Sequence, residues 1–193
     1  MAVLVIAGSG RNAGKTAVGC ELMRALQESC WTAVKITPHV HGFASAMNEE
    51  WDIASEKDTG RYLAAGAKRA FLIQGEDSGE KILDSLCSLR SADCSGQSLL
   101  IESNRIAPES IARDGERSLC LALLSGQPEQ WKSSLRQRAE EAQALVLTGG
   151  YCCDELPAAL QKKRVFQLIP GQWTSPELVS FVRKSLKQPY PVS

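Results

Sequence analysis

The chain has 193 residues, a length that suits one domain with a substantial buried core. Lys and Arg together number 22, as do Asp and Glu, so the formal net charge is zero. Proteins that act on nucleic acid commonly carry a basic surplus or a basic stripe, and the sequence shows neither. No apolar stretch has the length that spans a bilayer. We therefore expect neither nucleic acid nor membrane among the partners.

The apolar start of the chain has the composition of a strand. It lacks a basic region before it and runs straight into glycines, which argues against a signal peptide. The seven cysteines are odd in number and lie mostly inside apolar segments, as expected for thiols in a reducing compartment. We expect a cytoplasmic protein. Cys152 and Cys153 are adjacent, a spacing that matches no usual zinc site.

Short apolar runs alternate along the chain with segments of helical periodicity. Most of the runs are continuous and rich in Val, Ile and Leu, as in parallel strands that are buried on both faces. The pattern predicts an α/β fold: a doubly wound, mostly parallel sheet of about seven strands with helices on both faces. The predicted strands are 2–7, 32–37, 69–74, 98–102, 118–124, 144–148 and 165–169, and the predicted helices are 15–29, 59–66, 79–90, 128–142, 155–162 and 176–187.

Two segments lack periodicity. Residues 38–56 contain His, Gly, Trp and acidic residues, and we expect a long loop beside the site. Residues 188–193 contain two prolines, and we expect a flexible tail. No repeat or linker divides the rest, so residues 1–187 are predicted to form a single domain.

The segment GSGRNAGKT joins the first predicted strand to a helix rich in Ala and Leu. This strand–loop–helix setting is typical of a phosphate-binding P-loop. Backbone N–H groups of such a turn surround phosphate oxygens, and the helix N-terminus adds partial positive charge. We expect Lys15 to reach the β- and γ-phosphates of ATP or GTP, and the Thr16 hydroxyl to ligate Mg²⁺. The predicted nucleotide-binding residues are Gly8, Ser9, Gly10, Arg11, Asn12, Ala13, Gly14, Lys15 and Thr16.

The loop departs from the commonest P-loop at Ser9. This residue stands five positions before Gly14, where a glycine is usual, and Gly8 and Gly10 flank it. A tight strand–helix connection without a ligand is the alternative interpretation. The position directly after the first strand favours phosphate binding.

A P-loop site also needs a carboxylate at the end of a neighbouring strand to orient Mg²⁺ or its waters. Glu102 ends the predicted strand 98–102, and Asp52 and Asp58 are competing candidates. Arg105 follows closely and is a candidate cation for stabilising charge during phosphoryl transfer. The predicted catalytic residues are Lys15, Glu102 and Arg105, the predicted metal ligands are Thr16 and Glu102, and the other cations expected to flank the site are Lys35, Lys57, Arg61 and Arg113.

His39 and His41 lie two positions apart in the predicted loop. Such a pair can ligate a metal, or contact phosphates when protonated. A solvated loop without a ligand is the other interpretation.

Three further blocks carry a resemblance to a known family: AVKITPHVH at 33–41, EKDTGRYLAAGAKRAFLI at 56–73 and LLIES at 99–103. They are similar to the second strand, the Lys-Asp-Ser helix and the strand ending in Glu-Gly of the molybdopterin-guanine dinucleotide biosynthesis protein B family. With the P-loop they cover about the first half of the chain. The resemblance implies a P-loop NTPase that serves as a Mg²⁺-nucleotide adapter of molybdenum-cofactor maturation. It also implies slow or partner-stimulated hydrolysis, a cofactor-biosynthesis enzyme as partner, and a homodimer.

More distantly, the P-loop spacing and Lys35 resemble the dethiobiotin synthetase group, which implies an ATP-dependent ligase or kinase acting on a small acid. That group's Glu-Gly-Ala-Gly-Gly stretch is absent, and Ser103 stands where both families have glycine. No Asn-Lys-x-Asp follows strand 144–148, so ATP and GTP both stay open; a base would be met there by residues 148–151 through backbone and ring contacts. An interaction module with a vestigial loop is the third alternative.

Overall fold

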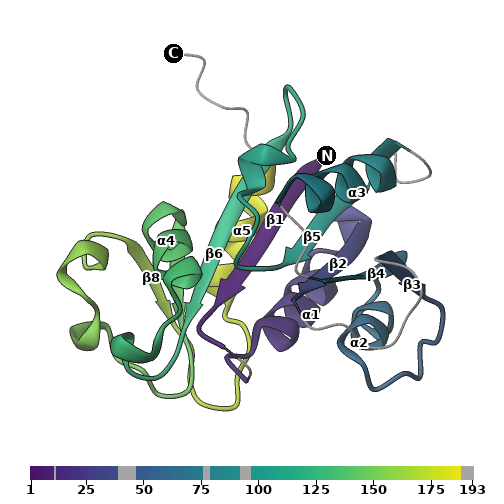
Figure 1. Ribbon diagram of the computed structural model, residues 1–193. Helices are drawn as coiled ribbons and strands as arrows, with labels where there is room; N and C mark the ends of the chain where they lie inside the picture. Colours follow the sequence, from purple (N-terminus) through teal and green to yellow (C-terminus); the bar gives the residue numbers. More distant parts are fainter. Residues whose placement is uncertain (11, 39–46, 76–78, 92–96, 188–193) are drawn as a thin grey trace.

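The computed structural model describes residues 1–10, 12–38, 47–75, 79–91 and 97–187. Within these ranges, eight strands form one sheet in the order β3-β4-β2-β5-β1-β6-β7-β8. Neighbouring strands are parallel except β3 and β4. The predicted doubly wound α/β fold is confirmed (Figure 1). The strands are β1 (Ala2–Gly8), β2 (Trp31–Thr37), β3 (Met47–Glu50), β4 (Arg69–Gln74), β5 (Ser98–Glu102), β6 (Arg117–Leu124), β7 (Ala144–Leu147) and β8 (Arg164–Gln167), and the helices are α1 (Lys15–Ala25), α2 (Asp58–Ala64), α3 (Gly79–Ser91), α4 (Ser133–Glu141) and α5 (Pro176–Lys187).

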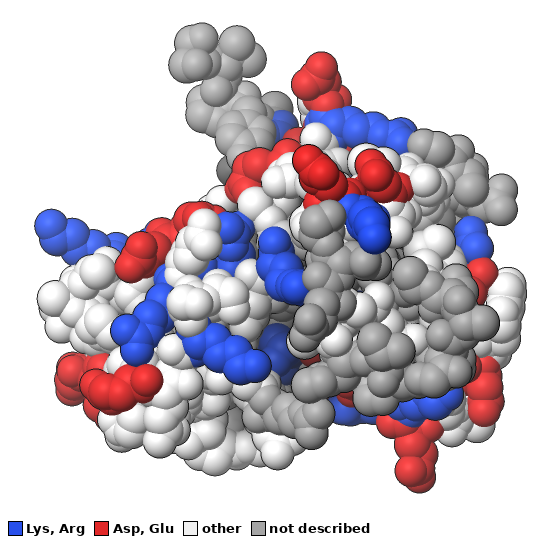
Figure 2. Space-filling view, viewed as in Figure 1, with Lys and Arg blue, Asp and Glu red and all other residues white. Residues whose placement is uncertain are grey.

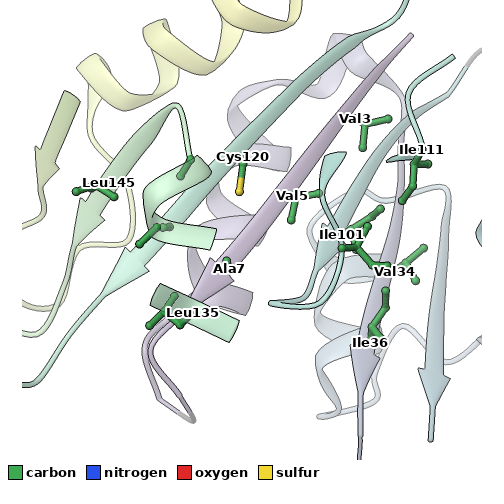
Figure 3. Close-up of a cluster of buried hydrophobic side chains, with 14 of the residues drawn as sticks. Val3, Val5, Ala7, Val34, Ile36, Ile101, Ile111, Cys120, Leu135 and Leu145 are labelled. Carbon is green, nitrogen blue, oxygen red and sulfur yellow. The ribbon is translucent and has the colours of Figure 1, made fainter. Parts of the chain in front are cut away.

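Strand β1 shows why both faces of the sheet are covered. All of its residues are buried. Val3 and Val5 pack into the cluster that includes side chains of α3 and α4, as Figure 3 shows for part of it, whereas Leu4 and Ile6 pack into the cluster with α1, α2 and α5. Successive side chains of a strand point to opposite faces, so a continuous apolar run needs a helix layer on each side. Figure 1 shows α4 and α5 on opposite faces of β6.

One strand lies where a loop was expected. Met47–Glu50 pairs antiparallel with β4, inside the segment 38–56. Its sequence, MNEE, is poor in the residues that favour strands, and all four residues are half-buried. An ion pair contributes to holding this edge strand, because Arg69 Nε lies 2.6 Å from Glu49 Oε1.

The predicted helix at 155–162 is wrong. Two 3₁₀ turns, Cys153–Glu155 and Ala158–Leu160, occupy this region. Pro157 separates them, and the residue before a proline is disfavoured in the helical conformation. Leu156 accordingly has an extended ψ of 137°.

Two other predicted helices are shorter than expected. The segment 15–29 ends as a helix at Ala25 and continues as the 3₁₀ turn Gln27–Ser29. The segment 128–142 begins with the 3₁₀ turn Pro128–Gln130 before α4. The remaining predicted elements begin and end within two residues of the observed ones.

Several expectations concern segments that the structure does not describe. His39, His41 and the tail 188–193 lie outside the described residues. Within the described part of the chain, no helix combines the length and the apolar character needed to cross a membrane. Lys and Arg side chains are interspersed with Asp and Glu over the face shown in Figure 2.

Among the described cysteines, Cys20, Cys30, Cys120, Cys152 and Cys153 are free thiols. Cys20 and Cys120 are buried, and burial raises their thiol pKa values to about 11 and about 12. These two residues behave as small apolar side chains of the core, as expected. Cys30, Cys152 and Cys153 are exposed.

A buried ion pair ties α3 to the segment before β6. Arg90 donates hydrogen bonds to both carboxylate oxygens of Glu116 and, at 2.5 Å, to the carbonyl oxygen of Ile111. The Arg90 and Glu116 side chains are 6% and 7% exposed. Burial alone would raise the pKa of Glu116, but the hydrogen bonds from Arg90 and from the Arg113 N–H, together with the Arg90 charge, outweigh burial and hold this pKa below the ordinary 4.5.

Replacing Glu116→Ala should lower the free energy of unfolding by about 3 kcal/mol at neutral pH, because Arg90 is left buried without a counter-charge. Urea denaturation measures this. The difference from wild type should be full above pH 4.5 and shrink as pH falls below it, since the wild-type carboxyl then becomes protonated. Glu21→Ala breaks an exposed pair with Arg24 and should cost less than about 1 kcal/mol. Equal losses in the two variants would contradict the assignment.

Candidate phosphate and metal site

The predicted phosphate loop lies between the carboxyl end of β1 and the first turn of α1. Ligand sites of open α/β sheets are found at this edge. Gly14 is the N-cap of α1 with φ of 85°, a left-handed conformation that favours glycine, and Asn12 also has a positive φ of 66°. Arg11 lies outside the described residues.

Neighbouring strands hold the start of this loop from both sides. Asn104, just beyond β5, accepts a hydrogen bond from the Gly8 N–H at 2.8 Å and donates one to the Gly8 carbonyl oxygen at 3.0 Å. On the β6 side, Ser9 donates its N–H to the Leu123 carbonyl oxygen at 3.0 Å. The Ser9 hydroxyl lies 2.7 Å from the Ser125 hydroxyl and accepts the Ser125 N–H at 3.0 Å. Ser9 thus makes side-chain contacts that the usual glycine could not make.

The centre of the site is the carboxylate of Glu102, which is only 5% exposed at the end of β5. The Thr16 hydroxyl donates to Glu102 Oε2 at 2.7 Å, so the two predicted metal ligands lie together. The Tyr62 hydroxyl donates to the same oxygen at 2.6 Å. Lys35 Nζ lies 3.2 Å from Oε1. Each donor comes from a different element: α1, α2 and β2.

Lys35 also pairs with Asp58, the first residue of α2. Burial disfavours the charge on Lys35, but the carboxylates of Glu102 and Asp58 outweigh burial and hold the pKa of Lys35 above 10.5. Burial likewise opposes the charge on Asp58, and the hydrogen bond and charge of Lys35 keep its pKa below 3.8. Asp58 is therefore part of the site. The other acidic candidate, Asp52, accepts the Ala54 N–H in its own turn at 2.9 Å.

The predicted cations differ in their positions. Lys15 Nζ donates to the Gly10 carbonyl oxygen at 2.7 Å, and burial lowers the pKa of Lys15 although the Glu102 charge partly offsets it. Arg105 is exposed and donates to the Gly75 carbonyl oxygen at 3.1 Å, beyond the carboxyl end of β4. Arg113 precedes the amino end of β6 and so lies at the opposite edge of the sheet, away from the loop.

Residues 148–151, which follow β7, were expected to contact a base, but the side chains of Thr148 and Tyr151 have other partners. Thr148, just after β7, donates its hydroxyl to the Ala13 carbonyl oxygen of the loop at 3.1 Å. The Tyr151 side chain is only 5% exposed, makes an edge contact with Trp131, and donates its hydroxyl to the Glu155 carbonyl oxygen at 2.7 Å. The Tyr151 ring is therefore not available to a base.

Asn104→Ala should lower the free energy of unfolding by about 2 kcal/mol, because the buried Gly8 N–H and carbonyl lose their side-chain partner. Amide hydrogen exchange should accelerate at Gly8 but not at Ser9, whose N–H bonds to β6. Gln137→Ala, which breaks an exposed contact with Glu141, should change stability by less than about 0.5 kcal/mol. Unchanged exchange at Gly8 would contradict the clamp.

Asp58→Asn should lower the free energy of unfolding by about 1.5 kcal/mol at neutral pH, a value at the low end for a charged hydrogen bond because the pair is partly exposed. The folded-state pKa of Asp58 is depressed, so this difference should be full above pH 3.8 and diminish as pH falls below it. Denaturation curves of both proteins across acidic pH measure it. A difference that grows on acidification would refute the pairing.

No protein-family model and no curated protein sequence matches the chain. Among solved structures, HypB from Helicobacter pylori, crystallised in complex with nickel, is similar over 100% of this chain and 91% of its own, with 13% identity and a TM-score of 0.54. MobB from Bacillus subtilis is similar over 97% of this chain and 99% of its own, with 17% identity. Its TM-score of 0.44 is too low to support an inference. The likeness to HypB concerns the fold: this chain has the α/β fold of P-loop NTPases.

Proposed function

We propose that the protein binds Mg²⁺ with ATP or GTP on the loop 8–16, and that it hydrolyses the nucleotide slowly or when a partner stimulates it. The observation that carries this proposal is the 2.7 Å hydrogen bond between the Thr16 hydroxyl and the Glu102 carboxylate, beside Lys15 at the start of α1. The two neighbouring loop residues Lys15 and Thr16 thus lie beside a carboxylate that is 86 positions from Thr16 in the sequence, as a phosphate and metal site would require.

The phosphates would lie against the N-terminus of α1, whose free N–H groups and dipole favour anions. Lys15 would exchange the Gly10 carbonyl oxygen for phosphate oxygens. Because burial disfavours its charge, a bound anion stabilises the ammonium group more than water does. These features support Lys15 as the phosphate-binding lysine of the loop.

Mg²⁺ fits the donors that are present. The ion prefers oxygen ligands, keeps several waters, and takes one or two protein oxygens besides phosphate oxygens. Thr16 and Glu102 offer a hydroxyl and a carboxylate of this kind. Among the described residues no group of three His, Cys, Asp or Glu side chains could hold a metal, and a P-loop magnesium site needs no such group. When bound, Mg²⁺ neutralises charge on the β- and γ-phosphates.

For hydrolysis we assign Lys15, Glu102 and Arg105 as the catalytic residues. Glu102 would orient a water of the metal, and its own orientation is fixed by Thr16, Tyr62 and Lys35. Arg105 would leave the Gly75 carbonyl oxygen to meet charge that develops on the γ-phosphate. A side chain that must first leave another partner is in line with slow turnover in the absence of a partner protein.

The resemblance to the molybdopterin-guanine dinucleotide biosynthesis protein B family supports an adapter role. In this role, nucleotide state would control the association with an enzyme of cofactor biosynthesis, and the working form would be a homodimer. The alternative is an ATP-dependent ligase or kinase of dethiobiotin synthetase type. The ammonium group of Lys35 beside Glu102 favours this second candidate, because it could also contact a small acid.

Thermal unfolding with and without ligand tests the nucleotide site. Mg²⁺ with non-hydrolysable ATP or GTP analogues should stabilise the wild type, by about 2.7 kcal/mol at a ligand concentration of roughly 100 Kd. Lys15→Ala should abolish this response, whereas Lys184→Ala, at an exposed residue of α5, should keep it. Thr16→Val should remove the part of the stabilisation that depends on Mg²⁺, and Thr16→Ser, which keeps a hydroxyl, should retain it. No response to either analogue in the wild type, at millimolar Mg²⁺, would refute the proposal.

Turnover assays on the wild-type protein distinguish the two candidate functions. Basal turnover that needs no small acid supports the adapter, and ATP turnover only with an added carboxylic or amino substrate supports the ligase or kinase.

A further inference from the structure

Trp173 lies directly on the phosphate loop. It belongs to the segment between β8 and α5. A Cβ atom placed on Gly14 would lie 2.2 Å from Cζ3 and 2.7 Å from Cε3 of the indole, so the ring occupies the space where a side chain of Gly14 would be. The residue nevertheless remains 36% exposed. The ring therefore contacts the loop at Gly14, and the residue keeps surface that is open to solvent beside it.

Trp173 lies on the opposite side of the loop from the metal site. In the sheet order, β5 and β2, which carry Glu102 and Lys35, are on one side of β1, and β6, β7 and β8 are on the other. The γ-phosphate belongs beside the metal and the cations. A nucleotide bound to α1 must then extend its sugar and base toward β7 and β8, where Trp173 lies.

The residues that follow β7 leave space for a sugar and a base on that side of the loop. Gly149 and Gly150 follow β7 with positive φ values of 66° and 79°. A Cβ on Gly150 would meet no atom within 4 Å, and one on Gly149 would meet only Ser125 Cβ at 3.8 Å. The neighbouring Thr148 hydroxyl is directed to the Ala13 carbonyl oxygen, and the Tyr151 ring is buried. Among the described residues on the β7 and β8 side of the loop, Trp173 thus offers an aromatic ring that a bound base could contact.

We propose that the Trp173 indole stacks on the purine base of the bound nucleotide and supplies most of the base affinity. This inference rests on the proposed function and names the residue that recognises the base. Aromatic stacking accepts any base because every base has a π-face. A site whose base contact is this ring should therefore discriminate weakly between ATP and GTP.

The test compares nucleotides with tripolyphosphate, which has the phosphates but no base. Affinities of wild type, Trp173→Ala and Trp173→Phe for Mg²⁺-bound ATP analogue, GTP analogue and tripolyphosphate are measured by calorimetry. Trp173→Ala should weaken both analogues about tenfold, the size typical of one stacked base, and leave tripolyphosphate within about twofold. Trp173→Phe should retain most of the affinity. Trp51→Ala, at a residue 80% exposed near the far edge strand β3, should change nothing.

Each result has one meaning. An equal loss for tripolyphosphate and the analogues shows that Trp173 only packs against the loop, and overturns the inference. The inference is also overturned if Trp173→Ala binds the analogues as tightly as the wild type does. The same holds if the wild type binds tripolyphosphate as tightly as the nucleotides. These two results would leave the proposed phosphate site intact. If wild type binds neither tripolyphosphate nor nucleotide, the proposed function itself fails. Far-UV circular dichroism and the melting temperature show whether a variant is folded, and the phenylalanine variant serves if alanine unfolds the protein.

Discussion

The architecture of the site depends on keeping one buried carboxylate satisfied. A charge that is removed from water costs free energy unless hydrogen bonds and counter-charges replace the water. Glu102 receives these from Thr16, Tyr62 and Lys35, each on a separate element. The carboxylate therefore fixes α1 and α2 against the end of β5. Gly19 allows their close contact, because a Cβ there would lie 3.2 Å from the Tyr62 ring and the ring would have to shift slightly.

The phosphate loop is held by a second set of contacts that does not involve Glu102. Asn104 connects its first residue to β5, Ser125 connects its second residue to β6, and Thr148 connects Ala13 to β7. The loop thus keeps its shape through hydrogen bonds to three strands and does not depend on a ligand for these contacts. Preorganisation of this kind lowers the entropy lost on binding. It also explains how a serine replaces the usual glycine, since the Ser9 hydroxyl is one of the anchors.

The sequence predicted the parts of the fold that depend on local pattern. Continuous apolar runs identified seven of the strands, and the position of Glu102 at the end of one run placed it in the site. Strand β3 was missed because its polar residues are held by pairing with β4, which no local pattern records. Tyr62 and Asn104 could not be found, because they act on residues 40 and 96 positions away and follow no recognised spacing. The apolar periodicity of 155–162 indicated a helix, but Pro157 lies within this segment and disfavours the helical conformation of the residue before it.

The hydrogen bond from Lys15 to Gly10 has a consequence for what the loop can select. An anion that binds here displaces an existing partner, so the first phosphate contact is an exchange and adds little net free energy. Small anions that offer only that contact are weak competitors. The exchange would become favourable for a ligand that also contacts the N-terminus of α1 and the groups around Glu102. On the proposed function, a lysine that already has a partner in its own loop would favour ligands with several linked phosphates over a single phosphate.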